Sequence, residues 1–185
     1  MIKYLVLLCA ACALWGCAAG SAAGGGGASS AQTGELPASA EHALLGAPAP
    51  DFSLPVHSAN GTGEVSLASA NGKVRLIDFW ATWCQPCRQS FPKYQQLQER
   101  YGDRIAIFAI SEDDDNQGIA AFAAETGVRF PLLWDQSKAV AAGYSVDAMP
   151  TVFIVDQNGL VRHVHSGFHP GDEDQIDAVI ASLLK

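Results

Sequence analysis

Basic residues are scarce in this sequence, which has 11 Lys and Arg against 19 Asp and Glu and a formal net charge of −8. An acidic surface repels a polyanion and no basic stripe stands out, so nucleic acid is excluded as a partner. Charged residues make up only 16% of the chain and hydrophobic residues 49%, which excludes a disordered polyampholyte and is enough for one well-buried domain. Internal repeats are also missing, so a repeat architecture is not expected.

The apolar run at the N-terminus, Leu5–Leu14, is too short to cross a bilayer, which takes about 20 residues. Lys3 precedes the run, and this order is typical of an export signal. The run ends in Leu14-Trp15-Gly16-Cys17, which resembles the bacterial lipobox. The resemblance implies cleavage after Gly16, a lipid on Cys17 and attachment to a membrane; an ordinary cleaved signal and an uncleaved anchor are the alternatives.

Cysteine is rare beyond this segment, because only Cys84 and Cys87 of the 5 cysteines follow Cys17. Cleavage would remove Cys9 and Cys12 and a lipid would occupy Cys17, so one close pair of thiols would remain. Such a pair cannot close a large loop, and a structural disulfide framework is therefore excluded. We expect the pair to carry chemistry instead.

The chain divides into three expected regions. Residues 1–16 form the signal peptide, and residues 17–46 hold the lipid-anchor cysteine and a flexible linker rich in Ala, Gly and Ser, with a reach of roughly 30 Å. Residues 47–185 form the folded domain, which starts near Pro48-Ala49-Pro50-Asp51-Phe52. A lipid anchor would place this domain on the periplasmic or extracytoplasmic side of the cell envelope.

Hydrophobic periodicity predicts an α/β domain. The expected strands are a pair around Val65–Leu67, then Leu76–Trp80, Ile105–Ile110, Phe130–Trp134, Thr151–Val155 and Leu160–Val164. One expected helix follows Cys87, a second is capped by Asn116, and a short third one starts at Ser137. A last helix carries Ile176, Val179 and Ile180 on one face. Strand, helix and strand around the cysteines imply a parallel βαβ unit, whereas Asn158-Gly159 predicts a hairpin.

The Cys-x-x-Cys spacing places two sulfurs within disulfide reach when the first cysteine lies at a helix N-terminus. Unpaired backbone N–H groups and the helix dipole would stabilise a thiolate on Cys84, as in the general case of thiols at helix starts. We therefore expect Cys84 to be the nucleophile and Cys87 the resolving thiol.

The segment Asp78-Phe79-Trp80-Ala81-Thr82-Trp83-Cys84-Gln85-Pro86-Cys87 resembles the active site of the thioredoxin superfamily. With Pro50-Asp51-Phe52 and a central insertion, the chain is most similar to the membrane-tethered branch typified by TlpA and ResA, over about residues 46–185. The resemblance implies a three-layer α/β/α sandwich with a mixed central sheet, an N-terminal β extension and the insertion. It also implies a monomeric thiol-disulfide oxidoreductase without a cofactor, acting on protein thiols and disulfides and supplied by an upstream membrane electron donor.

The same resemblance assigns roles to further residues. Met149-Pro150 matches a cis-proline loop that binds extended substrate, with a trans proline opening a strand as the alternative. Trp83, Gln85 and Pro86 would contact partners. Asp78 matches a buried acid that moves the proton of the second cysteine, with a satisfied strand residue as the alternative. Many TlpA-like proteins have Asn at this position, and some carry Glu where this chain has Ser90.

The sequence leaves alternatives for the direction of electron flow and for the class of protein. Gln85-Pro86 resembles reductive members, which implies a reductase of apocytochrome c or other envelope thiols. A thioredoxin-like copper-delivery module using His163 or His165 is one alternative, although no metal site is expected, and a peroxiredoxin-like peroxidase is another. The acidic run from Glu112 to Asp115 lacks the spacing of a calcium loop and is expected to be a solvated loop.

Overall fold

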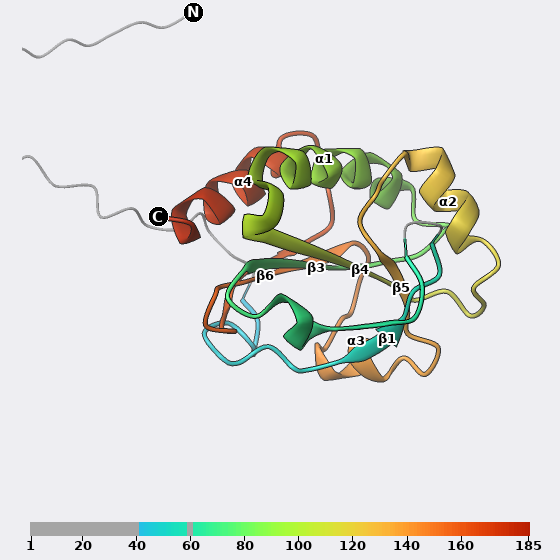
Figure 1. Cartoon of the computed structure of the whole chain (residues 1–185), viewed down its shortest axis with the longest axis horizontal. Helices are drawn as coiled ribbons and strands as arrows, with labels where there is room; N and C mark the ends of the chain where they lie inside the picture. Colours follow the sequence, from blue (N-terminus) through green and yellow to red (C-terminus); the bar gives the residue numbers. More distant parts are fainter. Residues whose placement is uncertain (1–40, 59–60) are drawn as a thin grey trace, which may run out of the picture. The chain divides into compact units, whose positions relative to one another are not determined.

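The computed structural model describes residues 41–58 and 61–185 (Figure 1). The expected signal peptide, Cys17 and the linker up to residue 40 lie outside the described residues. Within the described part of the chain, no helix has both the length and the apolar character that crossing a bilayer requires.

Thirteen short elements follow one another along the described chain. They are β1 (Ser53–Pro55), β2 (Glu64–Ser66), the 3-10 helix η1 (Leu67–Ala70), β3 (Val74–Trp80), α1 (Gln85–Tyr101), the 3-10 helix η2 (Gly102–Arg104), β4 (Ile105–Ser111), α2 (Ile119–Thr126), β5 (Leu132–Trp134), α3 (Ala139–Gly143), β6 (Thr151–Val155), β7 (Val161–Ser166) and α4 (Asp172–Leu183).

A five-stranded sheet of order β5-β4-β3-β6-β7 forms the middle layer. The β3–β4 and β4–β5 pairs are parallel, whereas β6 runs antiparallel to both β3 and β7. Helices α1, α2 and α4 cover one face, and α3, η1 and the β1–β2 hairpin cover the other (Figure 1). This mixed sheet between two layers, with its extra N-terminal hairpin, confirms the expected fold class.

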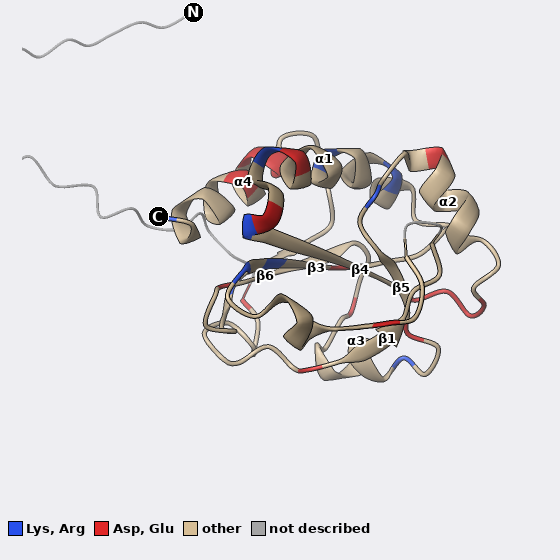
Figure 2. Ribbon diagram, viewed as in Figure 1, with Lys and Arg blue, Asp and Glu red and all other residues tan. Residues whose placement is uncertain are grey.

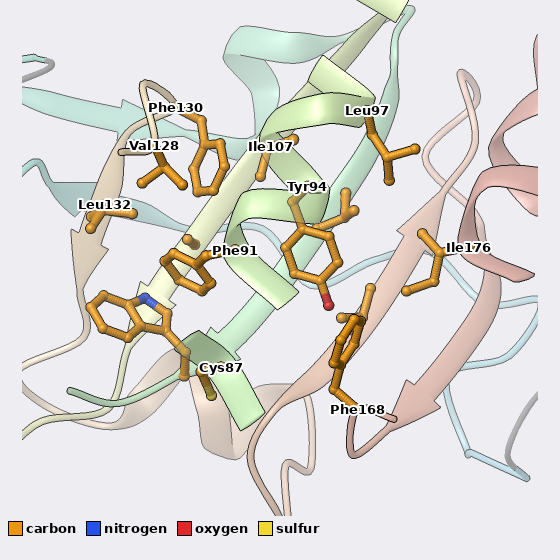
Figure 3. Close-up of a cluster of buried hydrophobic side chains, with 14 of the residues drawn as sticks. Cys87, Phe91, Tyr94, Leu97, Ile107, Val128, Phe130, Leu132, Phe168 and Ile176 are labelled. Atoms are coloured by element: carbon orange, nitrogen blue, oxygen red, sulfur yellow. The ribbon is translucent and has the colours of Figure 1, made fainter. Parts of the chain in front are cut away.

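Strand β3 is the centre of the core because both faces of the sheet are covered there. All seven of its residues are buried. Leu76 and Trp80 point into the cluster beneath α1, and Ile77 and Phe79 into the opposite cluster, as the two-residue period of a strand requires. Figure 3 shows the α1 cluster, in which Cys87 lies at one end of a row of aromatic side chains.

Several boundaries differ from the expected ones by one or two residues, and a local reason is clear at two of them. Helix α2 begins at Ile119, with Gly118 rather than Asn116 as its N-cap; Asn116 lies in the preceding turn, where its carbonyl accepts from the Ile119 N–H at 3.3 Å. The second expected strand ends at Ser66, because the Ser69 hydroxyl donates to the Ser66 carbonyl at 2.6 Å and closes a helical turn.

Residues 42–46, which the sequence placed in the linker, pack against the domain. The His42 ring lies edge-on to Phe153 at 5.0 Å, and Leu44 packs on the cluster opposite α1. The Gly46 N–H donates to the Val161 carbonyl at 2.8 Å, so this segment runs along the outer edge of β7.

Candidate active site

The two cysteines lie where β3 gives way to α1. Cys84 is the N-cap of α1, and its sulfur accepts from the Cys87 N–H at 3.3 Å. Pro86 stands in the first turn, where its missing N–H leaves no hydrogen bond unmade. The sulfurs are joined in a disulfide, with the Cα atoms 5.3 Å apart. The geometry that the Cys-x-x-Cys spacing predicted is therefore present.

The accessible part of this site is Trp83 rather than sulfur. The Trp83 residue is 67% exposed, whereas Cys84 is 3% exposed and Cys87 is fully buried. Gln85 is also exposed and Pro86 partly so. Trp83 and Gln85 therefore form the accessible surface around the dithiol, and Cys84 is the only one of the two cysteines with any exposed surface.

The loop before β6 stands beside the dithiol. Thr151 pairs with Phe79 across the β3–β6 ladder, so the residues just before it lie next to the end of β3. The Met149–Pro150 bond is cis, as expected, and Met149 packs on the cluster that contains both cysteines. The Gly167 N–H donates to the Pro150 carbonyl at 2.8 Å, which fastens the loop to the segment after β7.

Asp78 lies in the middle of β3 on the face that α1 covers. It is fully buried, and neither carboxylate oxygen has a hydrogen-bond partner among the described residues. Burial raises the pKa of Asp78 well above its ordinary value, because a charge without partners is costly away from water. The carboxyl therefore takes up a proton readily, which is the property that proton transfer needs.

Tyr94 is a second buried polar group on this face, and sequence reasoning did not single it out as a site residue. It lies on α1 two turns after Cys87, and Figure 3 shows its hydroxyl among the core side chains near Phe168. Burial, followed by the charge of Asp78, raises its pKa. Ser90 lies close enough to lower that pKa, but the Tyr94 hydroxyl has no partner of good hydrogen-bond geometry among the described residues.

Thr82 is held from two sides by residues that sequence reasoning did not single out. The Asp113 carboxylate accepts from the Thr82 N–H at 3.0 Å and from its hydroxyl at 2.8 Å. Arg88 donates to the Thr82 carbonyl at 2.8 Å, lies over the Phe122 ring at 4.8 Å and pairs with Glu125. These contacts fix the backbone two residues before Cys84.

The acidic run after β4 is therefore only partly a solvated loop. Asp114 and Asp115 are exposed, but Asp113 is buried and also accepts from the Ser111 hydroxyl at 2.8 Å. Asp113 is needed because it satisfies the otherwise unpaired donors of Thr82. No local pattern reveals this role, since the partners lie 31 residues apart.

Glu112 is partly buried at the same strand end. Its N–H donates to the Trp80 carbonyl at 2.8 Å, and one carboxylate oxygen is buried without a partner in the described chain. Burial first, then the charge of Asp135, raises the pKa of Glu112 to about 8, with Asp113 adding to the rise and Lys138 opposing it. Glu112 is therefore largely protonated at neutral pH.

The histidines of the copper alternative lie on β7. His163 is fully buried, with its ring stacked at 6.2 Å from that of His165, which contacts Asp172 at 2.9 Å. Across residues 41–58 and 61–185, no three His, Cys, Asp or Glu side chains are grouped to hold a metal ion. The geometry therefore offers the copper alternative no ligand cluster.

A dithiol that opens a helix at the end of a central strand, next to a cis-proline loop, defines a thioredoxin-like thiol-disulfide oxidoreductase. The comparisons agree with this class. The chain matches the AhpC/TSA family over residues 45–164, and it belongs to that family.

Relatives and solved structures narrow the placement. The chain is 40% identical to the thioredoxin-like protein YneN of Bacillus subtilis, over 66% of this chain and 71% of YneN. It is 32% identical to the thiol-disulfide oxidoreductase ResA of Geobacillus kaustophilus, over 66% of this chain and 70% of ResA. A crystal structure of a DsbE-type thiol:disulfide interchange protein from Chlorobium tepidum superposes with a TM-score of 0.72 at 37% identity, covering 76% of this chain and 98% of the other.

Proposed function

We propose that this protein reduces disulfides of protein substrates outside the cytoplasm. The observation that carries the proposal is the Cys84–Cys87 pair at the start of α1, in which Cys84 follows the exposed Trp83 and keeps a little exposed surface, whereas Cys87 is fully buried. ResA and DsbE-type proteins, which the chain resembles, are described as thiol-disulfide oxidoreductases and interchange proteins, and this supports the same chemistry here.

The reaction begins with the reduced protein. The Cys84 thiolate attacks one sulfur of a substrate disulfide, whose S–S bond breaks as a mixed disulfide forms and a substrate thiolate leaves. Asp78 takes the proton of Cys87, and the Cys87 thiolate then attacks the Cys84 sulfur and releases the second substrate thiolate. The substrate gains two electrons and the protein becomes the Cys84–Cys87 disulfide, which a dithiol donor at the membrane reduces again.

Substrate contact falls to the residues around the sulfurs. Trp83 and Gln85 offer exposed surface, and Pro86 stiffens the turn. The cis bond before Pro150 turns the backbone of Met149 toward an extended segment of the substrate. The Gln85-Pro86 pair supports the reductive direction, with apocytochrome c or other envelope proteins as substrates. A reduction potential nearer to about −270 mV, as in thioredoxin, than to about −120 mV, as in DsbA, is expected.

The location rests on the N-terminal sequence. A signal peptide at residues 1–16, a lipid on Cys17 and a flexible linker would hold the domain beginning near residue 47 at the outer side of a membrane. Replacing Cys17 with Ser should move the protein from the membrane fraction to the soluble fraction. Unchanged membrane attachment of that variant would contradict the lipid anchor.

A trapping experiment tests the reaction. Cys87→Ala removes the resolving thiol, so mixed disulfides through Cys84 should accumulate in cells and disappear on treatment with dithiothreitol. Cys84→Ala is the matched control, and it should trap nothing. Equal silence of both variants would refute exchange through Cys84, and the trapped proteins, if present, identify the substrates.

A further inference from the structure

Arg75 is a charged residue within the central sheet, and Figure 2 shows few charges on the strands there. It lies in β3 opposite Val155 of β6 and is 3% exposed. Burying a cation costs free energy unless partners balance its charge and satisfy its donors. The partners of the Arg75 guanidinium group therefore show whether this position has room for a ligand.

The protein uses only part of the hydrogen-bonding capacity of Arg75. A guanidinium group carries five N–H donors. The Nε–H donates to the Ala70 carbonyl at 2.9 Å, and Nη2 donates to the Asn71 side-chain oxygen at 3.3 Å. The edge formed by Nη1 and Nη2 therefore keeps donors that the described residues do not use.

Nearby acids balance the charge of Arg75 incompletely. Burial lowers the pKa of Arg75 below its ordinary value, and the charge of Asp156 opposes this only in part. The Asp156 carboxylate is engaged elsewhere, because it accepts from the Asn158 N–H at 2.9 Å and from the Leu160 N–H at 3.0 Å. Within the described residues, no carboxylate lies at salt-bridge distance from Arg75. A guanidinium group stays protonated even so, and one positive charge is left without a close partner.

Arg75 lines a pocket of about 310 Å³. Its Nη1 lies beside Gly159, another lining residue, at 3.7 Å from the place where a Cβ of that residue would stand. Pro48 and Leu67 give the pocket an apolar wall, and Asn158 gives it a polar one. We call it the Arg75 pocket.

The Arg75 pocket is built by three segments of the chain and is separate from the dithiol. The N-terminal segment, η1 and the turn between β6 and β7 meet there, and the Ala49 N–H donates to the Gly159 carbonyl at 2.9 Å. Backbone hydrogen bonds therefore hold two of its walls together. Arg75 lies near the start of β3, about 17 Å of strand away from Trp80, which precedes the cysteines.

We propose that the Arg75 pocket binds a small monocarboxylic acid with a short apolar body. The carboxylate accepts from Nη1 and Nη2 in the bidentate geometry that a guanidinium group favours, and the apolar body lies against Pro48 and Leu67. Asp51 also lines the pocket, so a second negative charge on the ligand is repelled. The site does not involve the dithiol, and the inference goes beyond the proposed function.

An NMR titration of the oxidised full chain with butyrate at pH 7.5 tests the binding. The Arg75 Nε–H is buried and hydrogen-bonded, so its signal reports on the guanidinium group directly. Butyrate should shift this signal and the amide signals of Asn158 and Gly159 until they saturate. Butyramide has nearly the same shape without the charge, and it should bind about tenfold more weakly or not at all. Equal binding of butyramide, or no saturable shift with butyrate, would overturn the proposal.

Anions with more charge distinguish a carboxylate site from a general anion site. Succinate and inorganic phosphate should each bind several-fold more weakly than butyrate, because both bring additional negative charge close to Asp51. Asp51→Asn should narrow this difference without weakening butyrate binding. Phosphate that binds the wild type as tightly as butyrate would show an adventitious ion only and would overturn the proposal.

Substitutions from different walls test the pocket itself. Arg75→Met removes the donors, Asn158→Asp adds a negative charge beside them, and Ala68→Trp fills the space; each should weaken butyrate binding by about tenfold or more. Gln157→Glu is the matched control for Asn158→Asp, because the Gln157 side chain points away to the Leu183 carbonyl at 2.8 Å, and it should keep the affinity within about twofold. Asn158 and Ala68 are exposed, so these two variants decide the result if Arg75→Met does not fold. Butyrate binding that persists in both would refute the site.

Discussion

Replacing Glu112 with Gln tests how burial controls a carboxyl group beside the active site. Burial is the largest cause that raises the pKa of Glu112 from 4.5 to about 8, and Asp135 and Asp113 add to it while Lys138 opposes it. The folded state therefore binds this proton more tightly than the unfolded state. The stabilisation is complete below pH 4.5 and is lost as the pH rises through 8.

The size of the effect follows from the difference between the two pKa values. Each pKa unit corresponds to about 1.4 kcal/mol, so the rise from 4.5 to about 8 sets a ceiling of about 5 kcal/mol. Glu112 is only partly buried, and water screens part of this energy. We therefore expect the free energy of unfolding of the wild type to fall by about 2 kcal/mol as Glu112 ionises at high pH. A neutral side chain at this position would avoid that loss.

The assay is urea unfolding of the oxidised full chain near pH 5, 7 and 9. Glu112→Gln should match the wild type near pH 5 and exceed its stability by about 2 kcal/mol near pH 9. Asp114→Asn, an exposed position in the same acidic run, is the matched control and should differ from the wild type by less than about 0.5 kcal/mol throughout. A difference between Glu112→Gln and the wild type that stays constant with pH would refute the reasoning.

Three further substitutions test the buried groups. Asp78→Asn should slow release of the mixed disulfide by about 100-fold, because general base catalysis by the carboxylate is lost; stopped-flow kinetics at the wild-type rate would contradict this. Asp113→Ala should lower the free energy of unfolding by about 2–4 kcal/mol, since it leaves the Thr82 donors unpaired, and a loss below about 0.5 kcal/mol in urea unfolding would count against the role given to these hydrogen bonds. Tyr94→Phe should change stability by less than about 1 kcal/mol, because its hydroxyl lacks a well-formed hydrogen bond in the described chain; a larger loss in the same assay would reveal a partner.

The local elements were predictable because their signals lie within a few residues of one another. The runs of β3, β4 and β6 indicate strands because they are short and rich in β-branched and aromatic residues, and the helical spacing of Phe91, Tyr94 and Leu97 indicates a helix. The start of α1 at Cys84 followed from the Cys-x-x-Cys spacing. The sequence predicted the start of α2 less well. Residues 116–118 form a turn before the helix, so the Asn116 side chain does not cap it.

The sequence by itself determined the dithiol, the α/β class and the acidic character of the chain, because each depends on composition or on short-range spacing. Only the tertiary structure decided that Asp113 holds Thr82, that the Tyr94 hydroxyl shares a buried face with Asp78, and that residues 42–46 pack along β7. Each of these depends on residues brought together from distant parts of the chain. The physical reason is that hydrogen-bond satisfaction and strand coverage are properties of the packed chain, whereas periodicity is a property of a segment.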